Sequence, residues 1–180
     1  MIRSPDTGHR SPVKREFKRF KLKKMRKRIV AGNWKMNTSF PEAEELISEM
    51  IDNLNEHDKP ENVDVILCVP FPFLELATDL INDTPLFAGA QNISQFNKGA
   101  YTGEVSAMML KSMGVTHSII GHSERRKYFN EEDATLAEKV NRAIENDLVP
   151  IFCVGELLEE REAEKHVNII QEQLEKCLLH

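Results

Sequence analysis

The amino-acid sequence predicts an α/β fold built on a parallel β-sheet, and two observations support this prediction. From Arg28 onward, short apolar runs rich in Val, Ile and Phe alternate with longer amphipathic stretches. The apolar runs are almost continuously hydrophobic, which is typical of strands buried on both faces of a parallel sheet. Strands that alternate with helices along a chain are joined by right-handed crossovers between neighbouring parallel strands.

Five apolar runs mark the predicted strands. In chain order they cover residues 29–31, 63–69, 86–90, 116–120 and 149–154. An amphipathic stretch follows each of them, so the sequence predicts five consecutive βα units.

The predicted helix after the first strand has a clear start. Ser39 to Glu42 reads as a capping box, in which the serine and the glutamate satisfy free backbone amides at the helix start. The apolar residues that follow share one helical face, namely Leu46, Ile47, Met50, Ile51 and Leu54.

The other helices are predicted from apolar stripes, and the last of them is a charged helix of about twenty residues. The stripes are Leu74, Leu76 and Leu80; Val105, Met109 and Leu110; Leu136, Val140 and Ile144; and Ala163, Val167, Ile170, Leu174 and Leu178.

Two architectures fit five βα units. A doubly wound sheet would be complete at this length, whereas a (βα)₈ barrel needs about 250 residues and would be incomplete. Chain length alone slightly favours the doubly wound sheet. The sequence has no Gly-x-Gly-x-x-Gly after the first predicted strand and no Walker loop, and residues 32–37 do not form a glycine loop suited to phosphate.

Charge divides the chain into two parts. The net charge is −5, which argues against nucleic acid as the main partner. Residues 1–24 contain nine basic and two acidic residues, a net charge of +7, so the remaining residues carry −12. We therefore predict a disordered basic leader over residues 1–24 and a folded domain over residues 25–180. A transit peptide, a nucleic-acid-binding arm and an upstream misassigned start before Met25 are the alternatives for the leader.

The three cysteines are too few and too widely spaced for a disulfide framework or a zinc site. They fit a reducing compartment, and we expect a cytoplasmic protein. No apolar run approaches the ~18 residues that a membrane helix needs, so no membrane association is expected.

Polar residues at the carboxyl ends of the predicted strands are the candidates for chemistry, because active sites of both architectures lie there. Asn33 and Lys35 follow the first strand, and the lysine could offer a positive charge to an anionic substrate. His122, Ser123 and Glu124 follow the fourth strand, where a helix can begin. The positive end of a helix dipole favours a neutral imidazole at such a position. An exposed lysine and a structurally hydrogen-bonded histidine are the alternative interpretations.

Five motifs occur in the order and spacing found in one enzyme family. They are residues 31–37, 89–92, 99–104, 121–126 and 153–156, with the sequences AGNWKMN, GAQN, GAYTGE, GHSERR and CVGE. Together they resemble the triosephosphate isomerase family from about Met25 to the end of the chain. The resemblance implies a TIM barrel that interconverts dihydroxyacetone phosphate and glyceraldehyde 3-phosphate without a cofactor or a metal.

The resemblance also implies roles for individual residues. Lys35 would bind the substrate anion, with Asn33 beside it, and His122 would be the neutral electrophile at the carbonyl oxygen. Glu124 would support the site by pairing with Lys35, next to Ser123. The loop around Thr102 would insert into the neighbouring subunit of a homodimer.

The sequence departs from the family pattern after the fifth predicted helix, where the chain ends. The family's catalytic glutamate, its lid and its phosphate loops belong to later βα units. We therefore expect five units of the barrel, a sheet open between the first and fifth strands, and a chain that is inactive alone. The alternatives are a non-catalytic, doubly wound binding domain and a dimerisation module that uses the Thr102 loop. Sequential strand order would indicate a barrel segment, whereas an order that reverses beside the first strand would indicate a doubly wound sheet.

Overall fold

A computed structural model describes residues 26–57 and 62–179, so the predicted leader at residues 1–24 lies outside the described residues. The described chain forms one five-stranded sheet. Its strands are β1 (Arg28–Asn33), β2 (Val63–Val69), β3 (Leu86–Ala90), β4 (His117–Ile120) and β5 (Val149–Phe152). All neighbouring pairs are parallel, and the order is β1-β2-β3-β4-β5. Sequential order excludes the doubly wound sheet and confirms a curled part of a (βα)₈ barrel.

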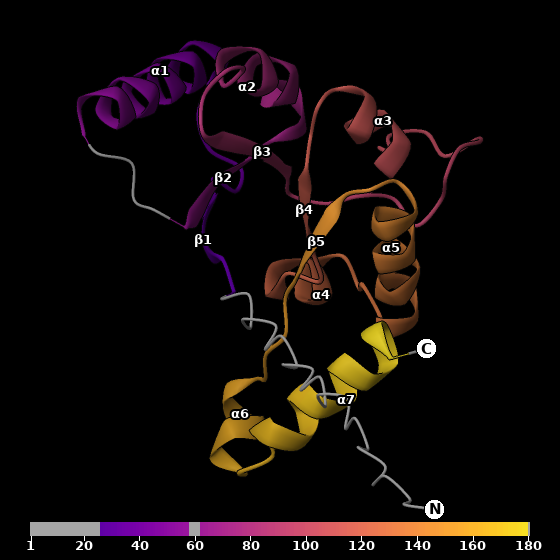
Figure 1. Cartoon of the computed structure of the whole chain (residues 1–180). Helices are drawn as coiled ribbons and strands as arrows, with labels where there is room; N and C mark the ends of the chain where they lie inside the picture. Colours follow the sequence, from indigo (N-terminus) through magenta and orange to yellow (C-terminus); the bar gives the residue numbers. More distant parts are fainter. Residues whose placement is uncertain (1–25, 58–61, 180) are drawn as a thin grey trace, which may run out of the picture.

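Helices follow the strands in the predicted alternation. They are α1 (Phe40–Glu56), α2 (Leu74–Leu80), α3 (Ala107–Ser112), α4 (Ser123–Tyr128), α5 (Asp133–Glu145), α6 (Leu158–Glu162) and α7 (His166–Leu178), and a 3₁₀ turn, η1 (Phe71–Phe73), precedes α2. Figure 1 shows the strands in the middle, with α1 and α2 on one side and α3 and α5 on the other. At the predicted start of α1, the Glu42 carboxylate accepts hydrogen bonds of 2.7 Å from the backbone amide and hydroxyl of Ser39.

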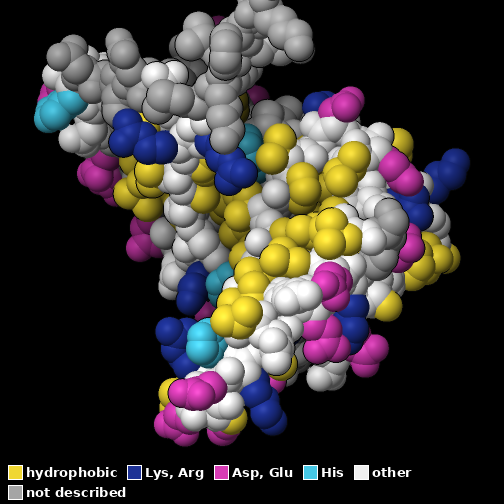
Figure 2. All heavy atoms as spheres, turned by 60° about the horizontal axis from the view of Figure 1, so that its bottom comes forward, with side chains coloured by type: hydrophobic (Ala, Val, Ile, Leu, Met, Phe, Trp, Pro, Cys, Tyr) yellow, Lys and Arg dark blue, Asp and Glu magenta, His cyan; other side chains and the backbone are white. Residues whose placement is uncertain are grey.

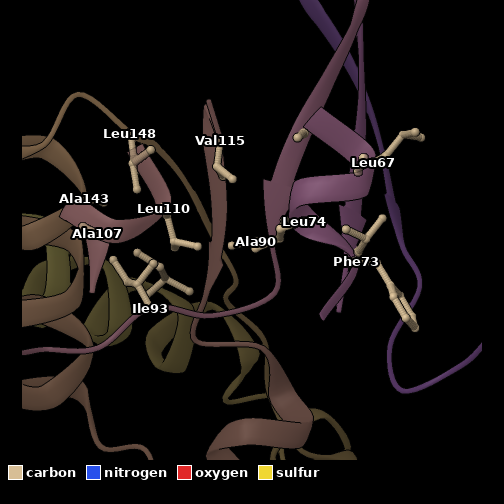
Figure 3. Packing of buried hydrophobic residues seen from close by; sticks show 14 of the residues in the cluster. Leu67, Phe73, Leu74, Ala90, Ile93, Ala107, Leu110, Val115, Ala143 and Leu148 are labelled. Carbon is tan, nitrogen blue, oxygen red and sulfur yellow. The ribbon is translucent and has the colours of Figure 1, made fainter. Parts of the chain in front are cut away.

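The main core lies between the sheet and the helices outside it. Residues of β2, β3, β4 and β5 point to this side, and they pack against apolar residues of the helices and loops. Figure 3 shows Ile93, Ala107 and Leu110 grouped on one side of Val115, and Leu67 and Phe73 on the other. The opposite face of the sheet carries a smaller cluster, formed by Ile66, Cys68 and Ile119 with Phe87, Ile151 and Cys153 around them.

The outermost strands differ from the prediction of burial on both faces. Ile29 and Val30 of β1 are 52% and 59% exposed, and Val149 of β5 is 50% exposed. All four residues of β4, in contrast, are buried. Burial follows position in the sheet, because in the described structure β1 and β5 each have only one neighbouring strand.

In a strand, the backbone N–H and C=O groups of successive residues point alternately to the two sides, so the hydrogen bonds to one neighbour show which groups face the open edge. In β1 the amides of Arg28 and Trp34 donate to the β2 side, so the even-numbered residues face β2 and Ala31 faces outward. In β5 the amides of Val149 and Cys153 donate to the β4 side. Pro150 therefore faces the open edge of β5, where it offers a carbonyl but no N–H.

Two of the predicted apolar helix stripes are wrong in part. The single charged helix predicted near the end of the chain is two helices, because Glu164 adopts a left-handed conformation with φ 56°. The amides of Glu164 and Lys165 then donate back into the last turn of α6 and close it. Val167 is 62% exposed, and Ile144 of α5 is 60% exposed, so neither belongs to the core.

The remaining helical prediction that changed is the one after β3. Val105 precedes α3 instead of lying within it, because Ser106 caps the helix by accepting a hydrogen bond from the Met109 amide. Over the described ranges, no helix is long and apolar enough to cross a membrane.

Candidate functional site

Lys35 lies on the loop that leaves β1, in a left-handed backbone conformation with φ 58°. Such a conformation is uncommon for a residue with a side chain. Two side chains hold the backbone on either side of it. The Lys35 amide donates to Oδ1 of Asn33 over 3.0 Å, and its carbonyl accepts a hydrogen bond of 3.0 Å from Nε2 of Gln91.

The short helix α4 begins directly after the fourth strand, where the sequence predicted a helix, and His122 caps it. Its Nδ1 accepts a hydrogen bond from the Glu124 amide over 3.2 Å. A carboxylate oxygen of Glu124 also lies 3.5 Å from the same nitrogen, which would suit a protonated ring. The amide is the closer group and can only donate, so we assign Nδ1 as the acceptor and place the ring proton on Nε2. A neutral imidazole with a free Nε2–H can donate to a substrate oxygen.

Glu124 links the two candidate residues. Its Oε1 lies 2.7 Å from Nζ of Lys35, and its backbone amide holds His122. The hydrogen bond from Lys35 is the main cause that holds the pKa of the Glu124 carboxyl below its ordinary value. Loops after β1 and β4 are therefore joined at one point, although Lys35 and Glu124 are far apart in the sequence.

A cleft of about 550 Å³ brings these groups together. At the carboxyl ends of β1 and β4 it is lined by Asn33, Lys35, His122 and Glu124. Aromatic side chains of η1 and of the end of α4 also line it. Ser123 lies at the start of α4, beside His122, and borders a neighbouring cavity of about 590 Å³ that is also lined by the loop after β5. Figure 2 shows hydrophobic side chains in a band across one face of the molecule, with charged groups around it.

Thr102 lies apart from this cleft, on the loop between β3 and α3. It is exposed, and the loop turns at Gly99 and Gly103, both with positive φ. The rings of Phe96 and Tyr101 stack with centroids 3.7 Å apart. The hydrogen bond of 2.9 Å from the Ser94 amide to the Val105 carbonyl closes the base of the loop. This long loop is therefore an ordered projection.

Sequence reasoning missed a buried ionic cluster beside the cleft. Nζ of Lys139 lies 2.6 Å from Glu131 and 2.8 Å from Oδ1 of Asn92, and Arg125 lies 2.7 Å from the same Glu131 oxygen. Lys139 is 4% exposed and Glu131 is 9% exposed. A lysine on the buried face of α5, among Leu136, Val140 and Ala143, was the available signal.

The arrangement can bind an anion and polarise a carbonyl. Lys35 supplies a cation, and His122 supplies a hydrogen-bond donor that carries no net charge. Within residues 26–57 and 62–179, no group of three or more His, Cys, Asp or Glu side chains is placed to hold a metal ion.

Fold and site together define a class of protein. A curled row of parallel βα units, with polar side chains gathered at the carboxyl ends of the strands, is the architecture of βα-barrel proteins. The family model described as triosephosphate isomerase matches residues 28–180, and the chain belongs to this family.

Individual relatives agree with this assignment. Triosephosphate isomerase of Cytophaga hutchinsonii is 47% identical over 156 residues, which cover 87% of this chain and 61% of that protein. The protein of the same name from Bacteroides fragilis is 49% identical over 150 residues, covering 83% and 59%. The crystal structure of triosephosphate isomerase from Bartonella henselae superposes with a TM-score of 0.78 at 38% identity, covering 86% of this chain and 62% of that one. The chain thus spans about three fifths of the length of these relatives.

Proposed function

We propose that the cleft at the ends of β1 and β4 binds a small phosphorylated triose and takes part in the isomerisation of dihydroxyacetone phosphate and glyceraldehyde 3-phosphate. In this reaction a proton moves between neighbouring carbons through an enediolate. Lys35 holds the anion and stabilises the negative oxygen, with Asn33 beside it. His122 donates from Nε2 to the carbonyl oxygen, while Glu124 and Ser123 keep the loop after β4 in place.

One observation carries the proposal. The ammonium of Lys35 and the imidazole of His122 line the same cleft of about 550 Å³, and Glu124 contacts both residues. A substrate with a carbonyl and a phosphate has one oxygen for the imidazole and a negative group for the lysine.

We further propose that the 180-residue polypeptide, assayed alone, has little or no turnover. Proton abstraction needs a carboxylate within hydrogen-bond reach of the substrate C–H. Of the described residues that line the cleft, Glu124 alone carries a carboxylate, and Lys35 already occupies it. A missing general base lowers the rate by about 10²–10⁴-fold.

The Thr102 loop supports a homodimer as the assembly in which this site works. Its exposed residues include Tyr101, 43% exposed, and Met108 and Met109 follow at 53% and 49%. Met36, next to Lys35, is 96% exposed. Apolar side chains exposed both on a projecting loop and beside the cleft are what a loop-into-partner contact would cover. We also propose a cytoplasmic location, because all three cysteines are free thiols.

Ligand binding and turnover test the proposal separately. Dihydroxyacetone phosphate added to the 180-residue protein should shift the side-chain NMR signals of Lys35 and His122. Lys35→Met should abolish the shift of the His122 signal, whereas the exposed Lys98→Met should keep the shifts of both Lys35 and His122. A coupled isomerase assay of the same protein should give no rate above buffer. Unchanged signals of Lys35 and His122 at saturating ligand would refute the binding site, and turnover typical of an isomerase would refute the proposed inactivity.

A further inference from the structure

Gln91, the first residue after β3, reaches two other loops with one side chain. Its Nε2 donates to the carbonyl of Lys35 over 3.0 Å and to the carbonyl of Cys68 over 2.9 Å. Cys68 lies in β2 and Lys35 follows β1, so the carboxamide ties the ends of three neighbouring strands together. Both N–H bonds of the Gln91 amide are used in this way.

The tie matters because of the conformation that it holds. Lys35 has φ 58°, and the left-handed region is disfavoured for a residue that carries a Cβ atom. Such a conformation persists only where the surroundings fix it. Asn33 fixes the amide of Lys35 from within the same loop. Gln91 fixes the carbonyl from another strand, and it therefore fixes the loop relative to the sheet.

We propose that Gln91 is a positioning residue, whose carboxamide holds the backbone of Lys35 so that the ammonium group points into the cleft. The Cys68 carbonyl serves as the anchor in this arrangement. It also accepts a hydrogen bond of 3.1 Å from the Trp34 amide and so belongs to the paired part of the sheet. The inference rests on the proposed role of Lys35 in the site, but the contact itself can be measured without substrate.

The Glu124 carboxyl provides the measurement. Its pKa lies below the ordinary value chiefly because Lys35 donates a hydrogen bond to it. Side-chain carbon NMR can follow this titration in the full 180-residue protein. Lys35→Met removes the donor and sets the upper reference for the Glu124 pKa. In Gln91→Met, which preserves the length of the side chain but not its donors, the Glu124 pKa should rise most of the way to that reference.

Gln173 offers a matched control. Its side chain also clamps backbone groups at a strand end, because Nε2 donates to the Gly155 carbonyl over 2.9 Å and Oε1 accepts from the Gly155 amide over 3.0 Å. Gln173→Met should leave the Glu124 pKa at the value of the unchanged protein. This control separates positioning of Lys35 from a general loosening of the loops.

Two results would overturn the proposal. The first is a Glu124 pKa that stays unchanged in Gln91→Met, and the second is a Glu124 pKa that rises in Gln173→Met as much as it does in Gln91→Met. If Gln91→Met does not fold, Gln91→Asn is read by the same criterion, since its amide is too short to bridge both carbonyls. Failure of dihydroxyacetone phosphate to bind would refute the proposed function but would leave the Glu124 titration as it is.

Discussion

Gly121, at the residue scale, determines how β4 turns into the loop that carries His122. It has φ 76°, and a Cβ atom there would lie 3.2 Å from Leu136 and 3.3 Å from the Cys153 carbonyl. Its own carbonyl accepts a hydrogen bond of 3.0 Å from Arg126. Positive φ and lack of space therefore both require glycine at this position.

Gly121→Ala should destabilise the fold by about 1–3 kcal/mol, because the left-handed conformation and the close contacts are both unfavourable for alanine. Urea unfolding followed by circular dichroism measures this change. Gly155→Ala is the control, since a Cβ atom at Gly155 meets nothing within 4 Å. Equal stability of the two variants would contradict the requirement for glycine at position 121.

His117 is a second residue whose surroundings have a measurable effect. Burial lowers the pKa of its imidazole below the ordinary 6.5, against an opposing attraction from the Asp64 carboxylate, which is paired with Lys27. The Thr116 hydroxyl donates to the Ala88 carbonyl over 3.1 Å and lies 2.7 Å from Nδ1 of His117, so the ring donates to it.

Stability should therefore fall as the pH falls below about 6.5. The unfolded chain gains a proton on His117 there, whereas the folded chain does not, and the loss stops once the pH passes the lower folded pKa. Urea midpoints between pH 7.5 and pH 5 measure the effect. His117→Gln should flatten this pH dependence, and a variant with the same slope as the unchanged protein would contradict the assignment.

The strand-end positions of the candidate site could be predicted from the sequence, whereas the roles of its residues and the pairing of Glu124 with Lys35 came from the family resemblance. Lys35, His122 and Glu124 were placed at strand ends by motif and order, and the structure brings them to one cleft. The left-handed backbone of Lys35 could not be predicted. It depends on a hydrogen bond from Gln91, 56 positions away in the chain, and such a contact exists only once the sheet has formed.

At the element scale, α5 is fixed to the loops around the cleft by charge as well as by apolar packing. Burial lowers the pKa of Lys139, and Glu131 opposes that shift. Burial also raises the pKa of Glu131, but hydrogen bonds from Lys139 and Arg125 outweigh it and hold the value below the ordinary range. The cluster ties α5 to the loop after α4 and, through Asn92, to the loop after β3.

Lys139→Met should cost about 3 kcal/mol of stability, because it leaves a buried carboxylate with one cation fewer. Thermal or urea unfolding measures the loss. Adding Glu131→Gln to this variant should recover part of it, since the uncompensated charge is then gone. Lys98→Met, at an exposed position, should change the stability little. A loss of stability in Lys139→Met as small as that in Lys98→Met would contradict the role of the cluster.

The strands and the start of α1 were predicted well, because apolar runs and capping residues are local signals. The division between α6 and α7 was not predicted, since Glu164 does not favour a left-handed conformation as glycine does. Hydrophobic spacing alone also could not distinguish buried from exposed positions on α7, where only Cys177 is buried.

At the scale of the whole molecule, the described sheet has two open edges. An exposed edge of unpaired N–H and C=O groups can pair with another chain. We therefore expect the 180-residue protein to associate with itself as its concentration rises, which sedimentation velocity or light scattering would detect.

Ala31→Pro should weaken this association, because it removes an outward N–H from β1 without breaking a bond to β2. Val30→Pro is the informative comparison, since the Val30 amide faces β2 and its loss should destabilise the fold instead. A protein that stays monomeric at all accessible concentrations would contradict the expected self-association. Equal association of Ala31→Pro and the unchanged protein would show that the β1 edge is not the contact.

Because of Pro150, the two open edges of the sheet differ in how well they can pair with a strand of another chain. A strand of another chain that pairs with β5 finds no N–H donor at Pro150. A strand that pairs with β1 finds outward amides at alternate positions. A head-to-tail contact joins a β1 edge to a β5 edge and lacks the N–H that Pro150 cannot supply, whereas a contact between two β1 edges has outward amides on both sides. Self-association should accordingly favour closed pairs joined through Ile29 and Ala31 over long head-to-tail assemblies.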